Sequence, residues 1–161
     1  MRTIFFLLIV SVFLVSCGGS TGEKSGSDGN YTDDNKGKAA IVLELNSNDR
    51  MEYDKTVLHA YEGQEITLIL NHTGNESVNI MGHNFVLLKD DVNIDRFAAA
   101  ASNARSNDYI PERDEFIVHT KMLGGGESDT IVFQAPAKGF YDYICTYPGH
   151  YLMMRGQLAI H

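Results

Sequence analysis

The chain has 161 residues and a formal net charge of −8. This length accommodates one domain with a buried core. The acidic balance would repel phosphate groups, so it excludes nucleic acid as an expected partner and slightly favours a partner with a basic surface.

Residues 1–16 predict a signal peptide. Arg2 supplies a short positive start, and residues 3–15 are almost wholly apolar. Such a segment is too short for a stable transmembrane helix and is typical of a secretory signal. Residues 14–17 (LVSC) resemble a bacterial lipobox, in which cleavage before the cysteine is followed by acylation of the thiol, here that of Cys17. The alternative is ordinary cleavage nearby, which would leave Cys17 as a free thiol or remove it.

A lipidated Cys17 would anchor the exported protein in the bacterial cell envelope, since each buried methylene adds about 0.8 kcal/mol of membrane affinity. In the lipoproteins that this start resembles, Asp after the cysteine favours the inner membrane. Gly18 stands there instead and weakly favours the outer membrane, with the domain on its periplasmic face. Residues 17–38 are rich in Gly, Ser, Asp and Asn and predict a flexible tether. The folded domain is therefore expected at residues 39–161.

Residues 39–161 predict an all-β fold. Ile41, Leu43 and Leu45 alternate with polar neighbours, as in a strand with one buried face. Further strands are expected at residues 64–71, 85–88, 116–119, 130–134, 140–145 and 157–161. Several short strands separated by turn residues indicate a sandwich or barrel. Residues 93–104 are rich in alanine and predict one short helix inserted between strands.

The strongest candidate site is a turn near the C-terminal end. Cys145, His150 and Met154 form a Cys-x4-His-x3-Met pattern, with Pro148 and Gly149 in the loop between the first two. Thiolate, imidazole and thioether are donors that copper and zinc prefer over carboxylates. Taken alone, Cys145 fits a buried structural thiol equally well. The three donors at this spacing favour a metal site.

A further donor lies upstream, in residues 81–84 (MGHN). A lone histidine on a strand is more often structural than a ligand, so His83 is a weak signal by itself. Gly82 allows the backbone to approach closely, and Asn84 is able to hydrogen-bond across to the loop that carries Cys145. Metal ligands are held by such partners, which makes Asn84 a candidate clamp on that loop.

The chain has two cysteines. One disulfide is the default expectation for an exported chain with two cysteines. If Cys17 is lipidated and Cys145 binds a metal, no disulfide remains. A lone thiol in an oxidising compartment needs protection, and coordination to a metal provides it.

These segments resemble the azurin branch of the cupredoxin family. Residues 81–87 (MGHNFVL) are similar to the family's upstream-ligand segment, and residues 145–150 (CTYPGH) with residues 154–156 (MRG) are similar to its ligand loop. Residues 119–129 also look azurin-like. The resemblance therefore covers nearly all of residues 39–161.

The resemblance implies a cupredoxin Greek-key β-barrel or sandwich of about eight strands that holds one mononuclear type 1 copper. Its implied ligands are three equatorial side chains, a long axial thioether and a weak axial carbonyl. The equatorial ligands would be His83, Cys145 and His150. The axial thioether would be that of Met154, and the weak axial carbonyl that of Gly82.

Three points qualify this assignment. Met153 is the rival axial ligand because it is adjacent, and the spacing in the family favours Met154. His72 coincides with a family histidine that lies partly buried near the site without binding the metal, and both a structural and a modulating role stay open. The disulfide that azurins usually carry near the start of the barrel has no cysteines to form it here.

The resemblance also implies a one-electron shuttle that cycles between Cu(I) and Cu(II) and makes weak, transient contact with redox proteins such as c-type cytochromes or terminal oxidoreductases. The electron port would be His150, within an apolar patch. The residues of this apolar patch are Met81, Tyr147, Pro148, Gly149, Tyr151 and Leu152. The ligand set leaves no equatorial position for a substrate, so an enzyme is not expected. The alternative is an envelope copper carrier or storage protein with the same ligands.

Overall fold

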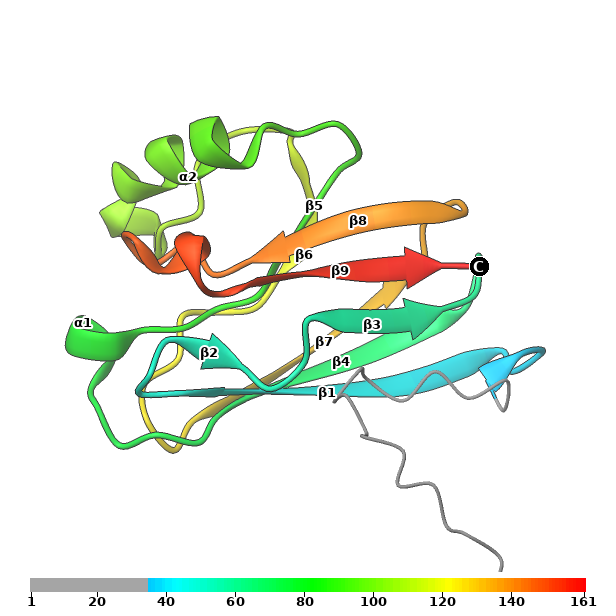
Figure 1. The fold of residues 1–161 in the computed structure, drawn as a ribbon, viewed down its shortest axis with the longest axis horizontal. Coiled ribbons are helices and arrows are strands. Elements are labelled where there is room, and N and C mark those ends of the chain that lie inside the picture. Colours follow the sequence, from blue (N-terminus) through cyan, green and yellow to red (C-terminus); the bar gives the residue numbers. More distant parts are fainter. Residues whose placement is uncertain (1–34) are drawn as a thin grey trace, which may run out of the picture.

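The computed structural model describes residues 35–161, whose strands form two sheets. The first sheet has the order β2 (Glu52–Tyr53), β1 (Ala40–Asn48), β4 (Glu65–His72), β7 (Ser128–Gln134). The second has the order β3 (Val57–Ala60), β9 (Arg155–Ile160), β8 (Gly139–Ile144), β5 (Val86–Leu88), β6 (Phe116–His119). The two sheets pack face to face as a sandwich (Figure 1), which confirms the predicted all-β class.

The predicted signal peptide, the lipidation site at Cys17 and most of the predicted tether lie outside the described residues. The last part of that tether, residues 35–38, forms a turn against the domain. The side-chain amide of Gln64, only 4% exposed, donates to the carbonyls of Asn35 (2.7 Å) and Lys38 (3.0 Å). Hydrogen bonding to the domain therefore begins a few residues before residue 39.

The strand count differs from the prediction of about eight, because nine strands are present between residues 35 and 161. The two strands without a predicted counterpart are β2 and β3, with two and four residues. Segments this short give no clear alternation of apolar and polar residues. Both pair with a longer partner: β2 runs antiparallel to β1, and β3 runs parallel to β9.

The main core lies between the sheets and follows the alternation in the sequence. On β4, Ile66, Leu68 and Leu70 are at most 1% exposed, and the parallel partner β1 contributes Ile41 and Leu45 to the same apolar cluster. Each such side chain stabilises the fold by about 1.5–3 kcal/mol relative to an exposed position. The candidate ligands lie against this core, which fixes the strands that carry them.

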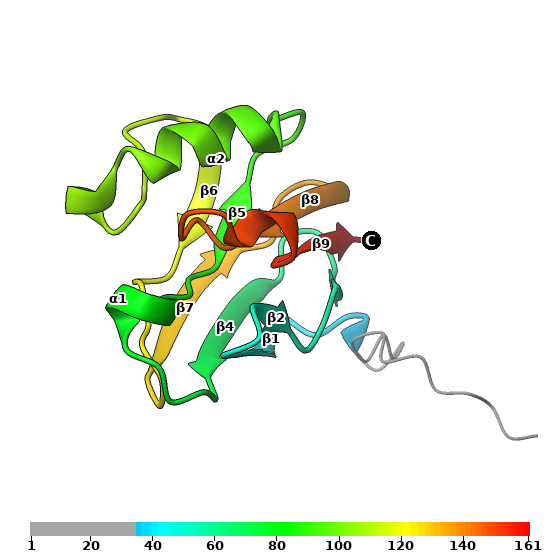
Figure 2. The ribbon, with the colours of Figure 1, turned by 60° about the vertical axis from the view of Figure 1, so that its left-hand side comes forward.

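The predicted inserted helix is confirmed as α2 (Ile94–Ser102). The side chain of Asn93 caps its N-terminus by accepting a hydrogen bond from the backbone of Arg96 at 2.9 Å. Its buried face packs through Phe97 onto a second apolar cluster that includes Val86 on β5 and Ile144 on β8. Figure 2 shows α2 lying over β5 and β6.

A second helix, α1 (Val78–Met81), had no counterpart in the prediction. It is four residues long, and it leads directly into Gly82 and His83. Figure 1 places α1 and the turn between β8 and β9 at one end of the sandwich, opposite the C-terminus. In the part of the chain that the structure describes, no helix is long and apolar enough to cross a membrane.

Candidate metal centre

The turn between β8 and β9 carries three of the candidate ligands. Cys145 directly follows β8 and Met154 directly precedes β9, and the backbone N–H of Cys145 donates to the carbonyl of Met154 at 3.0 Å. Gly149 has a φ of 83°, which a glycine adopts without strain, and it starts the 3₁₀ turn His150–Leu152. This reversal turns His150 back toward Cys145.

His83 reaches the site from a different part of the chain. Its N–H donates to the carbonyl of Leu123 at 3.0 Å, and the N–H of Leu123 donates back to the carbonyl of His83 at 2.7 Å. This isolated bridge fixes the backbone of His83 between α1 and β5. The imidazole is thus held by a segment 62 residues away from Cys145 in the sequence.

The three predicted equatorial ligands meet at one buried point. The Sγ of Cys145 lies 3.9 Å from Nδ1 of His83 and 3.8 Å from Nδ1 of His150, and the two Nδ1 atoms are 3.3 Å apart. Cys145 and His83 are fully buried, and His150 is 5% exposed. A triangle with these sides has room at its centre for one ion at about 2.0–2.3 Å from each atom, the usual range for imidazole nitrogen and thiolate sulfur. The residues fit a single metal ion with one sulfur and two nitrogen donors.

The structure distinguishes the two axial candidates by burial. Met154 is fully buried in the same apolar cluster as Cys145, whereas Met153 is 62% exposed. On the other side, the carbonyl oxygen of Gly82 lies 3.8 Å from the Sγ of Cys145. A Cβ atom at Gly82 would lie 2.6 Å from the carbonyl oxygen of Val78 and 2.8 Å from the ring of Tyr147. Only glycine lets the backbone approach the site this closely.

Hydrogen bonds from outside the ligand set orient His83 and the loop of Cys145. The Nε2 of His83 lies 2.9 Å from the carbonyl oxygen of Asn48. Donation by Nε2 leaves the lone pair of Nδ1 free to face the site. Asn84 is bonded twice to Thr146: its amide donates to Oγ1 at 2.7 Å, and its Oδ1 accepts from the backbone N–H at 2.8 Å. The hydroxyl of Tyr53 donates to the carbonyl of Asn84.

Sequence reasoning missed Asn48 and Tyr53. Asn48 acts through its backbone carbonyl, which any residue provides, so its type carries no signal. Tyr53 lies on the two-residue strand β2 and is 9% exposed. A buried tyrosine hydroxyl requires a partner, but the identity of that partner depends on the fold.

His72 lies behind His83 and is more deeply buried than expected, at 1% exposed. The two imidazole rings are stacked, with centroids 4.4 Å apart and an interplanar angle of 29°. Its Nε2 lies 2.8 Å from the carbonyl of Met81, and its Nδ1 accepts a hydrogen bond from the backbone of Gly74 at 3.1 Å. Both nitrogens therefore have protein partners, and His72 supports His83 without facing the ligand triangle.

Burial determines the protonation of the metal-free site. Burial lowers the pKa of His83 and that of His150 from 6.5 to about 4. It also raises the pKa of the Cys145 thiol to about 12. At pH 7 the metal-free site therefore holds two neutral imidazoles and a protonated thiol. A metal cation that binds has to displace the proton of the thiol.

The residues of the predicted apolar patch lie in the segments around His150. Tyr147, Pro148 and Gly149 belong to the loop before it, and the 3₁₀ turn adds Tyr151 and Leu152, of which Leu152 is 63% exposed. Met81 is the last residue of α1. The hydroxyl of Tyr147 donates to the carbonyl of Asn79 at 2.6 Å, which connects the loop to α1.

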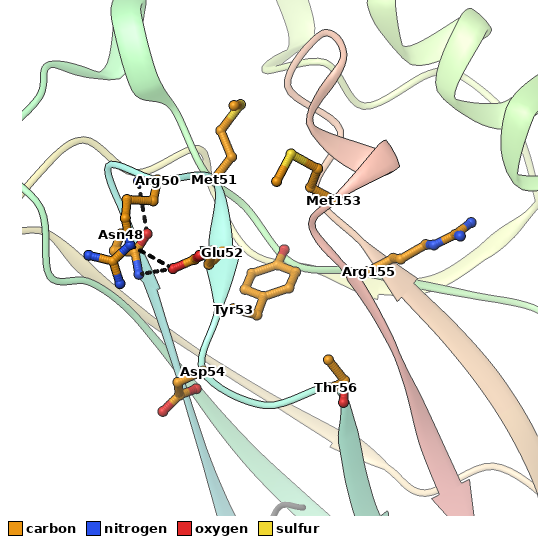
Figure 3. A pocket seen from close by; sticks show the side chains of 9 residues that line it. All are labelled: Asn48, Arg50, Met51, Glu52, Tyr53, Asp54, Thr56, Met153 and Arg155. Carbon is orange, nitrogen blue, oxygen red and sulfur yellow. Dashed lines mark hydrogen bonds and ion pairs between the residues drawn. The ribbon is translucent and has the colours of Figure 1, made fainter. Parts of the chain in front are cut away.

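A groove of about 420 Å³ adjoins this end of the sandwich (Figure 3). Its lining includes Asn48 and Tyr53, the two residues that bond to His83 and Asn84, together with the exposed Met153. The charged pair Arg50 and Glu52, with nitrogen and oxygen 2.9 Å apart, lies on one side. His83, Cys145, His150 and Met154 do not line the groove, so it is separate from the metal centre.

Comparisons with known proteins agree with this geometry. Residues 39–161 match the family model described as copper binding proteins, plastocyanin/azurin family. Azurin-2 of Alcaligenes xylosoxydans xylosoxydans is 37% identical over 124 residues, which cover 72% of this chain and 94% of that protein. Outer membrane protein H.8 of Neisseria gonorrhoeae is 34% identical over 129 residues, which cover 77% of this chain and 68% of that protein.

A solved structure shows the same fold. Auracyanin A of Chloroflexus aurantiacus, described as a "blue" copper protein, is similar with a TM-score of 0.67 and 31% sequence identity, over 76% of this chain and 99% of that chain. His83, Cys145 and His150 form a candidate site for one type 1 copper in this fold. The resemblance drawn from the sequence is confirmed: the chain belongs to the plastocyanin/azurin family of copper-binding proteins.

Proposed function

We propose that this protein is a one-electron shuttle between redox partners in the bacterial cell envelope, with a type 1 copper as its redox centre. The observation that carries the proposal is the buried triangle of His83, Cys145 and His150, held by two separate segments of a rigid sandwich. Copper bound there supplies reversible exchange of one electron between Cu(I) and Cu(II).

The protein's own groups suit such exchange because they hold one arrangement. Thiolate and thioether donors favour the reduced ion, while imidazole accommodates both oxidation states. The bond from His83 to Asn48 and the two bonds between Asn84 and Thr146 keep the donors in place. A buried site held in this way loses little energy to rearrangement when the charge of the ion changes.

His150 is the proposed port for electrons. It is the most exposed of the three equatorial candidates, at 5%, and most residues of the proposed apolar patch are its neighbours in the sequence. Leu152 within that patch is 63% exposed, so a partner is able to pack against it and exclude water near His150. A small apolar contact suits a weak, transient encounter. We expect partners such as c-type cytochromes or terminal oxidoreductases, and the acidic charge of the chain favours basic surfaces on them.

The envelope location rests on two supports. The first is the lipobox-like start that ends at Cys17, and the second is the similarity to a protein named outer membrane protein H.8. Acylation of Cys17 would hold the shuttle at a membrane, with the outer membrane weakly favoured. Expression of the full gene with radiolabelled palmitate tests this: the label should enter the wild-type protein and be absent from Cys17→Ser.

The function is tested by adding Cu(II) to the purified full chain and recording visible and electron paramagnetic resonance spectra. We expect an intense blue charge-transfer band and a narrow copper hyperfine splitting, both of which reflect a copper–thiolate bond. Cys145→Ser should abolish the band, while the same substitution at the other cysteine, Cys17→Ser, should keep it. A colourless copper complex of the wild-type chain would instead support a copper carrier or storage protein.

A further inference from the structure

An aromatic contact extends from His150 to the segment that follows the inserted helix. The ring of Tyr147 lies 4.6 Å from the ring of His150, centroid to centroid, at an angle of 40°. The ring of Tyr109 lies edge-on to Tyr147, with centroids 5.4 Å apart and an angle of 61°. Both separations lie in the range of about 4.5–7 Å that is preferred by packed aromatic pairs. Three rings thus form a continuous series that starts at a metal ligand.

Tyr147, the middle ring, is fixed at both ends. Its hydroxyl donates to the carbonyl of Asn79 at 2.6 Å, and its ring edge lies where a side chain at Gly82 would stand. A cavity of about 120 Å³ adjoins the two tyrosines and is lined also by Arg105 and Met122. The position of Tyr147 is therefore set by α1 and by the backbone next to His83.

Tyr109 is held in its place by an unusual backbone. Asp108 and Tyr109 are consecutive non-glycine residues with positive φ, 49° and 59°. This conformation costs roughly 1–2 kcal/mol per residue for side chains other than glycine, and it persists only where the surroundings impose it. The N–H of Tyr109 donates to the carbonyl of Ala104 at 3.0 Å, and the next residue, Ile110, is buried in the second apolar cluster. The turn therefore directs Tyr109 at Tyr147.

We propose that Tyr147 and Tyr109 form a second electron-transfer route, which connects His150 with the surface at the turn of residues 105–109. This inference rests on the proposed function, because it assumes a redox-active ion next to His150. The route ends outside the apolar patch, to which Tyr109 does not belong. It would let a partner exchange electrons while bound at the inserted segment.

The route works by tunnelling through packed rings. Tunnelling decays exponentially with distance, and it decays less steeply through packed atoms than across a gap. Both tyrosines stay neutral, because the electron passes directly between the partner and the copper, and the hydroxyl of Tyr147 keeps its proton in the hydrogen bond to the carbonyl of Asn79. One electron leaves the partner and reduces Cu(II) to Cu(I), and no bond is formed or broken.

The test places a photoactive ruthenium polypyridyl label on the copper-loaded full chain. The label is attached at Ser106→Cys, an exposed position in the turn, in a Cys17→Ser background. After a flash, the excited Ru(II) passes one electron to Cu(II) and becomes Ru(III), and the loss of the blue band gives the rate. A second label at Thr130→Cys, exposed on β7, serves as the control. Strand β7 belongs to the sheet that does not contain β8 and β9, so a path from this label to the copper does not pass through Tyr109.

Tyr109→Asn removes the ring and retains a residue that tolerates a positive φ. We expect it to slow transfer from the label at position 106 severalfold and to leave the rate from position 130 unchanged. Tyr109→Phe should retain the rate from position 106, because the ring and not the hydroxyl provides the coupling. An equal rate in wild type and Tyr109→Asn at position 106 would overturn the route, as would a loss in Tyr109→Phe equal to that in Tyr109→Asn.

A measurement without copper tests the geometry independently. In the metal-free protein, nuclear Overhauser contacts should connect the ring protons of Tyr109 with Tyr147 and those of Tyr147 with His150. Absence of either contact would overturn the route whatever the rates. If the labelled wild type forms no blue site, the proposed function fails; if the blue site forms and Tyr109→Asn has no effect, only this inference fails.

Discussion

Asn84 and Thr146 are joined by two hydrogen bonds in opposite directions, 2.7 Å and 2.8 Å long, across 62 positions of sequence. Asn84 is fully buried and Thr146 is 2% exposed. Asn84 follows His83 and Thr146 follows Cys145, so the pair connects the two segments that bring the ligands together. This buried pair therefore restricts the distance between His83 and Cys145.

Asn84→Leu should therefore destabilise the metal-free protein by about 1–3 kcal/mol, since it leaves the N–H of Thr146 buried without an acceptor. Thr146→Val removes one of the two bonds and leaves the side-chain N–H of Asn84 without that acceptor, but the backbone N–H of residue 146 keeps its acceptor, so the loss should be smaller than in Asn84→Leu, which removes both bonds. Urea unfolding measures both. The double variant should lose less than the sum of the two single losses, and strict additivity would show that the two bonds do not act together.

Gly82→Ala should destabilise the fold and displace Tyr147. The backbone of Gly82 has φ −70° and ψ 139°, which alanine adopts freely, so any loss is steric. The added methyl group would lie 2.6 Å from the carbonyl of Val78, and overpacking of this kind costs about 1–3 kcal/mol. Gly139→Ala is the matched control, because its new methyl group would make only ordinary contacts of 3.6 Å or more. Equal thermal unfolding of the two variants would contradict the close approach at Gly82.

Much of this architecture is predictable from the sequence because it depends on local patterns. The alternation in β4 predicts its buried face, and the alanine-rich segment predicts α2. The Cys-x4-His-x3-Met pattern already selects a turn, since its donors lie within ten residues. His83 is different, because a lone histidine does not by itself predict a metal ligand. It is predicted as a ligand only through the resemblance of residues 81–87 to the azurin branch.

The remaining features depend on contacts that no local pattern encodes. The carbonyl of Asn48 meets His83 only because β1 ends beside the site. Strand β2 is too short to show periodicity, yet it places the hydroxyl of Tyr53 within hydrogen-bonding distance of the carbonyl of Asn84. Tyr109 meets Tyr147 through a turn with positive φ at residues of ordinary type. In each case the tertiary structure, and not the identity of the residue, determines the partner.

Acidification should destabilise the metal-free protein between pH 6.5 and about 4. His83 and His150 have a pKa near 4 when folded, because burial disfavours the charged imidazole, and 6.5 is the ordinary value after unfolding. The unfolded chain therefore binds more protons in this window, so stability falls as pH falls, by less than about 1.4 kcal/mol per pH unit for each histidine. Urea unfolding across this range measures the slope.

The same slope should be shallower in the double variant His83→Gln, His150→Gln. Carboxylates whose pKa is lowered, such as Asp49 and Glu52 with their hydrogen bonds, also begin to lose their contribution at the acid end of this window. The difference in slope between the wild type and the double variant therefore reports the histidines. An unchanged slope in the double variant would show that other groups cause the acid sensitivity.

Met154 and Met153 provide a matched pair for the axial position. Met154→Leu keeps the volume of a fully buried side chain and removes its sulfur, so its cost in stability should stay below about 1.5 kcal/mol. Leucine offers no donor in place of the sulfur, and the loss of any donor disfavours the more highly charged Cu(II), so Met154→Leu should raise the reduction potential and alter the blue spectrum. Met153→Leu changes the same group at a position that is 62% exposed and should leave both unchanged. Redox titration followed at the blue band compares the variants, and a shift in Met153→Leu alone would exchange the roles of the two methionines.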